Sequence, residues 1–95
     1  MKVVLDTNVL ISGIFFGGLP RTILDAWAEE RFELLVSPIP ITADPGDDKF
    51  MLCARDSGAI IVSGDRHLLD ASGWEGVRVM KPHDFLVYLD NPEAP

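Results

Sequence analysis

The chain has a single cysteine, Cys53, among its 95 residues, and it has little positive charge: eight Lys and Arg stand against fifteen Asp and Glu, a net charge of −7. One cysteine excludes an internal disulfide and a zinc site built on several thiolates, which fits a reducing cytosol. So few cations cannot hold nucleic acid by bulk electrostatics, because phosphate neutralisation needs clustered Lys and Arg. Any contact with nucleic acid would then be local, or bridged by metal cations.

Long apolar runs are also lacking. No stretch approaches the roughly 18 apolar residues of a membrane-spanning helix. The N-terminus enters a short apolar run directly, without the basic region and cleavable apolar segment of a secretory signal. These absences predict a soluble, cytoplasmic protein. With 47% apolar residues, the chain can form one small domain over residues 1–95 with a modest core.

Short apolar runs do occur, and helical patterns separate them. The runs predict buried strands over residues 3–5, 32–36, 59–63 and 77–80. Helices are expected over 8–16, from Pro20 onward, over 47–57, briefly over 67–69, and from Pro82 to Asn91, whereas the three prolines in 38–46 predict a loop. This alternation predicts an α/β fold: a three-layer α/β/α arrangement around a small four-stranded parallel sheet.

The spacing of apolar residues also predicts which helix faces are buried. In the second helix the expected inner face consists of Ile23, Leu24, Trp27 and Ala28, and in the last helix it consists of Phe85, Leu86 and Leu89.

Acidic residues recur where the predicted strands end or the following helix begins. Asp6 follows the first strand directly, Asp65 follows the third strand after one glycine, and Asp47 opens the helix that leads into the third strand. Open α/β sheets bind ligands at the edge where the carboxyl ends of their parallel strands meet. We therefore expect these three carboxylates, from separate segments, to converge at one edge.

Converging carboxylates repel one another unless a cation lies between them, and hard oxygen ligands suit Mg²⁺ or Mn²⁺. Such an ion can polarise a phosphate and activate a water for phosphodiester hydrolysis. Asn8 could orient that water or hydrogen-bond the Asp6 carboxylate, and Ser63 could do the same for Asp65. The residues thus predict a catalytic site of Asp6, Asp47, Asp65, Asn8 and Ser63 that uses a divalent cation.

Three segments resemble a known family: Leu-Asp-Thr-Asn-Val at 5–9, Asp-Pro-Gly-Asp-Asp-Lys-Phe at 44–50, and Val-Ser-Gly-Asp-Arg-His-Leu-Leu at 62–69. They are similar to the PIN domain, and most similar to the VapC-like toxins of prokaryotic toxin-antitoxin pairs. The resemblance implies a metal-dependent endoribonuclease that acts on single-stranded or structured RNA, is usually dimeric, and is neutralised by an antitoxin protein. By position, Asp6, Asp47 and Asp65 match the family's acids, and Asn8 and Ser63 match its polar neighbours.

One part of the family's pattern is missing. After its second strand the family continues into two helices, the first of which supplies a glutamate to the metal site, whereas this chain runs within a few residues into segment 44–50. No glutamate occurs between Glu33 and Glu75, so Asp44 is the nearest substitute as a metal ligand. The missing helices would leave apolar surface uncovered near the second helix and strand, which predicts a homodimer or higher oligomer.

Other readings stay open. The missing glutamate is compatible with a shortened PIN-like domain that has lost catalysis and acts as a binding or dimerisation module. An Asp after the first strand also begins aspartyl-phosphate enzymes, although phosphatases of that kind usually carry a second Asp where this chain has Asn8. Each acid alone is also explained as a helix cap or a solvated loop end. His67 is expected to be a surface or turn residue.

Overall fold

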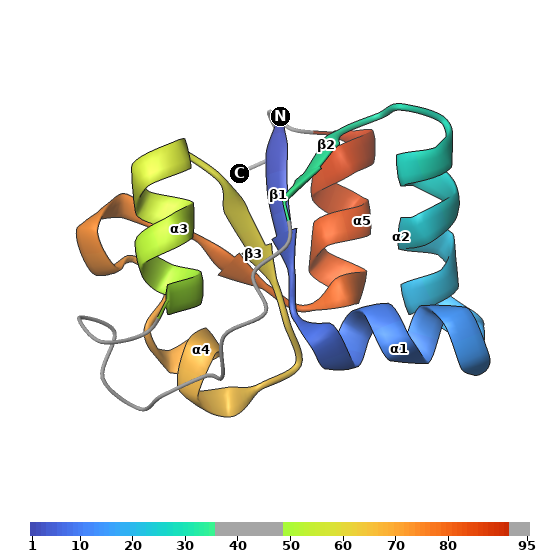
Figure 1. Ribbon diagram of the computed structural model, residues 1–95, viewed down its shortest axis with the longest axis horizontal. Helices are drawn as coiled ribbons and strands as arrows, with labels where there is room; N and C mark the ends of the chain where they lie inside the picture. Colours follow the sequence, from blue (N-terminus) through green and yellow to red (C-terminus); the bar gives the residue numbers. More distant parts are fainter. Residues whose placement is uncertain (36–48, 92–95) are drawn as a thin grey trace.

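The computed structural model describes residues 1–35 and 49–91 (Figure 1). The strands are β1 (Lys2–Leu5), β2 (Glu33–Leu35), β3 (Ile60–Val62) and β4 (Val79–Met80). The helices are α1 (Thr7–Phe15), α2 (Gly18–Ala28), α3 (Lys49–Ser57), α4 (Arg66–Asp70) and α5 (Pro82–Asp90), and a 3-10 turn, η1 (Trp74–Gly76), precedes β4. All four predicted strands are therefore present, each within two residues of its expected bounds.

The strands form one parallel sheet in the order β2-β1-β3-β4, as the strand and helix alternation predicted. Val3 of β1 aligns with Leu34 of β2 on one side and with Ile60 of β3 on the other. Val62 of β3 aligns with Met80 of β4. The two strands that precede Asp6 and Asp65 are thus neighbours at the centre of the sheet.

Alternation along β1 distributes the core over both faces of the sheet, because successive side chains of a strand point to opposite sides. Val3 and Leu5 belong to a cluster with residues of α1, α2, α5 and β3 and with Phe32, which precedes β2: Val9, Ile23, Ala26, Phe32, Ile60, Val62, Phe85 and Leu89. Val4 belongs to a second cluster, with Met51, Ala54, Ala59, Ile61, Leu68, Val77 and Val79. Figure 1 shows α3 and α4 on one face of the sheet and α1, α2 and α5 on the other, which is the expected three-layer arrangement.

The buried face of α2 differs from the expected one. Ile23 is buried and Leu24 packs against the core, but Trp27 is 46% exposed and Ala28 is also exposed, while Ala26 is buried in their place. The small Ala26 lies in the cluster that contains Phe85 of α5. The helix therefore packs its small side chain into the core and leaves the indole of Trp27 partly exposed to solvent. The prediction for α5 is confirmed, since Phe85 and Leu89 are buried and Leu86 packs against them.

The second strand was expected to be buried, and that expectation is wrong. Glu33 is exposed, and Leu34 and Leu35 are only half-buried. β2 lies at the edge of the sheet and pairs only with β1 within the described ranges, so it lacks the second neighbour that would cover it.

Two glycines make the corner between α1 and α2. Gly17 and Gly18 have φ angles of 76° and 70°, which glycine adopts at little cost. They end α1, as predicted, and turn the chain through 95° into α2. In the described part of the chain no single helix is long and apolar enough to cross a membrane, although this bent pair would qualify on length and composition alone.

Candidate functional site

Asp6 lies where β1 ends and α1 begins, and its side chain is almost completely buried, with 3% of the residue exposed. Its backbone N–H donates to the carbonyl of Val62, which places it against the end of β3. Its Oδ1 accepts a hydrogen bond from the backbone N–H of Asn8 at 3.1 Å, so Asp6 is the N-cap of α1. The predicted contact between Asn8 and the Asp6 carboxylate is therefore made, by the Asn8 backbone.

Ser63 holds the other oxygen of this carboxylate. The Ser63 hydroxyl, fully buried, donates to Oδ2 of Asp6 at 2.7 Å, a short bond of the kind made to an ionised acceptor. The same Oγ accepts the backbone N–H of Asp65 at 2.9 Å. Ser63 thus acts on the Asp6 side chain and on the Asp65 backbone, whereas it was expected to act on the Asp65 carboxylate. The reason is the sheet order, which puts Ser63 beside the end of β1.

Asp65 is the N-cap of α4. Its Oδ1 accepts a hydrogen bond from the backbone N–H of Leu68 at 3.2 Å, and the residue is half-buried. Its Oδ2 accepts no hydrogen bond from any residue that the structure describes. One oxygen of Asp65 therefore remains available for a ligand.

Asp6 and Asp65 line the same cavity, which has a volume of about 440 Å³. The other lining residues come from α1, from the starts of α2 and α5, and from the loop before α4: Asn8, Val9, Ser12, Pro20, Gly64 and Pro82. Ser12 was not among the predicted site residues, although its position four residues after Asn8 puts it on the same helix face. Pro20 and Pro82 could not be found that way, because only the tertiary fold brings them here.

The cavity does not contain the complete predicted ligand set. Asp47 and the alternative ligand Asp44 lie outside the described residues. Within residues 1–35 and 49–91, no three His, Cys, Asp or Glu side chains lie close enough together to hold a metal ion. His67 is exposed on α4, as expected.

No protein-family model matches this chain, and no curated protein and no solved structure matches it either.

Asp6 is a buried acid at the amino end of α1, where the helix dipole favours a negative charge. A buried carboxylate is costly unless it is paired or fully hydrogen-bonded. In the part of the chain that the structure describes, Asp6 has two hydrogen-bond donors and no Lys, Arg or His partner within 4.0 Å. Each carboxylate oxygen has two lone pairs, so both oxygens of Asp6 can still bind a ligand. Together with Oδ2 of Asp65, these oxygens suit a hard divalent cation that keeps several of its waters.

Proposed function

We propose that this chain is a PIN-like, metal-dependent endoribonuclease and the toxin of a toxin-antitoxin pair. The observation that carries the proposal is the buried Asp6, which lies in one cavity with Asp65 and lacks a cationic partner among the described residues. The proposed reaction, RNA cleavage, is inferred from the resemblance of segments 5–9, 44–50 and 62–69 to the PIN domain. The parallel sheet agrees with the proposal because it brings the ends of β1 and β3 together.

Each residue of the proposed site has a distinct task. Asp6 and Asp65 would hold Mg²⁺ or Mn²⁺, and Asp47 would complete the set. The bonds from Asn8 N–H and from the Ser63 hydroxyl fix both oxygens of Asp6, so little orientational freedom is lost when a ligand binds. A bound divalent cation would supply positive charge beside the scissile phosphate and help a water molecule to lose its proton.

RNA cleavage tests the proposal directly. The wild type should cleave a labelled single-stranded RNA in the presence of Mn²⁺ or Mg²⁺ and should be inactive in EDTA. Asp6→Asn keeps the shape of the side chain but removes the charge, and it should slow cleavage about 100-fold or more, because a metal ion contributes several kcal/mol of transition-state stabilisation. Asp25→Asn is the matched control, since Asp25 is exposed on α2 and pairs with Arg21. Equal cleavage by both variants would refute the proposal.

A second candidate function is a binding or dimerisation module without catalysis. The absence of a three-ligand cluster among the residues that the structure describes favours it. Paramagnetic broadening distinguishes the two functions, because Mn²⁺ bound at the site should broaden the amide NMR signals of residues 5–9 and 63–66. Unchanged signals up to millimolar Mn²⁺ would favour the module and count against the nuclease.

Protein partners belong to the same proposal. Large apolar side chains are exposed around the corner between α1 and α2: Ile11, Ile14, Phe15, Phe16 and Leu19. Phe15 is 73% exposed to solvent and Phe16 is 83% exposed. Exposed apolar side chains gathered in this way are typical of a protein interaction surface. We propose that they support a homodimer or higher oligomer and the binding of an antitoxin, in a cytoplasmic setting.

A further inference from the structure

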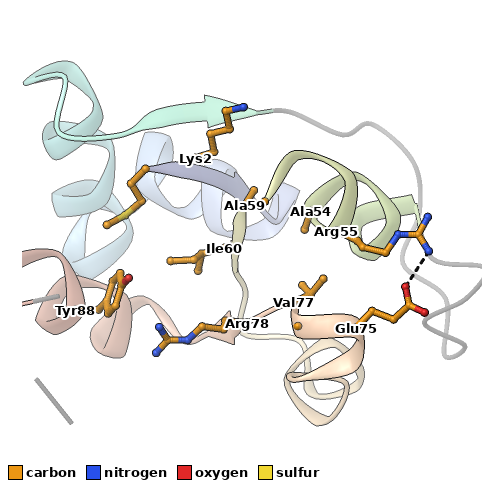
Figure 2. A pocket seen from close by; sticks show the side chains of 12 residues that line it. Lys2, Ala54, Arg55, Ala59, Ile60, Glu75, Val77, Arg78 and Tyr88 are labelled. Atoms are coloured by element: carbon orange, nitrogen blue, oxygen red, sulfur yellow. Dashed lines mark hydrogen bonds and ion pairs between the residues drawn. The ribbon is translucent and has the colours of Figure 1, made fainter. Parts of the chain in front are cut away.

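Arg78 and Tyr88 form a pair of side chains beside β4 that the proposed reaction does not use. The guanidinium carbon of Arg78 lies 4.8 Å from the centroid of the Tyr88 ring, in cation–π geometry. Arg78 comes just before β4 and Tyr88 lies on α5. Figure 2 shows the guanidinium of Arg78 directed toward the tyrosine ring.

Arg78 keeps its charge available, in contrast to Arg55. The Arg55 guanidinium bonds Asp56 at 3.0 Å and Glu75 at 3.1 Å, and these hydrogen bonds raise its pKa above the ordinary value. Arg78 has no carboxylate partner among the residues whose positions are described. In a chain with a net charge of −7, an unneutralised guanidinium fixed on an aromatic ring is a local anion-binding group.

Arg78 and Tyr88 are shared by two cavities. One, of about 470 Å³, lies at the amino ends of β1 and β3, where Lys2 also lines it (Figure 2). The other, of about 440 Å³, lies between β4 and α5 and is lined in addition by Met80 and His83, and by Asp84, whose carboxylate is 3.5 Å from the His83 ring. The Arg78 and Tyr88 pair thus lies where two hollows meet.

The hollow between β4 and α5 and the acidic cavity are lined by consecutive residues of α5. His83, in the hollow, directly follows Pro82, which lines the cavity of Asp6 and Asp65. Pro82 lies four positions after Arg78, which corresponds to at most about 14 Å of extended chain. The exposed Lys81 lies on this stretch, again without a carboxylate partner in the described part of the chain. Arg78 and Lys81, two cations without a carboxylate partner among the described residues, thus flank β4, which is an edge strand in the described part of the sheet.

We propose that single-stranded RNA follows this edge, with Arg78 and Tyr88 as its second anchor. A base stacks on the outer face of the guanidinium, which the tyrosine ring supports from behind, and Arg78 and Lys81 bond phosphates on either side. This inference rests on the proposed nuclease function, because the acidic cavity defines where the scissile phosphate lies. It also explains how an acidic protein can hold RNA with a few local cations.

Binding measured without cleavage tests this path. Fluorescence anisotropy of a labelled 12-nucleotide single-stranded RNA is followed in EDTA at several salt concentrations. Arg78→Gln should weaken binding about tenfold and lower the slope of log K against log salt by about 0.7. Lys81→Gln should lower the slope by the same amount. Tyr88→Leu should weaken binding about fivefold with an unchanged slope, because it removes a ring and no charge. Arg21→Gln is the charge-matched control, because the Arg21 side chain is exposed on α2 and pairs with Asp25, and it should bind like the wild type.

Comparison with cleavage in Mn²⁺ separates the two ideas. If the wild type cleaves RNA and the Arg78 and Tyr88 variants bind like Arg21→Gln, the path is wrong and the nuclease stands. If the wild type does not cleave but its binding depends on Arg78 and Tyr88, the RNA surface is supported and the nuclease is refuted. If the wild type binds no RNA at low salt, the path is refuted. Circular dichroism of the variants confirms that each is folded.

Discussion

Removal of the Ser63 hydroxyl should loosen both acidic loops at once. Ser63→Ala deletes the donor to Oδ2 of the buried Asp6 and the acceptor of the Asp65 backbone N–H. A hydrogen bond to a charged group contributes about 1.5–3 kcal/mol, and an amide left without its acceptor adds about 1 kcal/mol or more where water cannot reach it. Since Asp65 is half-buried, water replaces part of the second loss. We expect the free energy of unfolding to fall by about 2–4 kcal/mol.

Urea denaturation followed by tryptophan fluorescence measures this loss. Ser57→Ala is the matched control, because the Ser57 hydroxyl donates only to the Cys53 carbonyl of its own helix and its removal should cost about 1 kcal/mol or less. A double-mutant cycle with Asp6→Asn should show a coupling energy of about 1 kcal/mol or more between positions 63 and 6. A Ser63→Ala protein as stable as Ser57→Ala, with no coupling to Asp6, would refute the reasoning.

Two further outcomes follow from the α1 and α2 corner. Gly13→Ala places a Cβ 2.9 Å from the Pro20 carbonyl oxygen and 2.7 Å from Leu24 Cδ1. It should therefore lower the free energy of unfolding by about 1–3 kcal/mol and Tm by several degrees, although helix propensity alone favours alanine. A higher Tm in calorimetry would contradict this packing argument. Phe15→Ser with Phe16→Ser should shift the light-scattering mass at micromolar concentration from an oligomer to a single chain, and a wild type that is already monomeric would rule out self-association.

Local patterns were sufficient to predict the positions of the strands and the end of α1. Apolar runs bounded by an acid or a glycine identified β1 and β3, and Asp6 and Asp65 were expected where they lie, because a cap next to a buried strand is encoded within a few residues. Gly17 and Gly18 ended α1 as predicted for the same reason.

Properties that depend on neighbouring elements were not predictable in this way. The hydroxyl of Ser63 points to Asp6 because β1 and β3 are adjacent, and the order of strands in a sheet cannot be deduced from the residues of one segment. Trp27 fits a helical apolar stripe but is half-exposed, because the position of α5 decides which side of α2 is covered. The convergence of Asp47 with the other two acids stays a prediction, since that residue is outside the described part of the chain.

The division of the core by β1 has a consequence for cooperativity. The apolar residues on the two faces of the sheet form two separate clusters, and β1 contributes to both: Val3 and Leu5 to one, Val4 to the other. Neither cluster can persist once the strand detaches, because each would lose a fully buried valine. We therefore expect the two clusters to unfold together in a single cooperative transition.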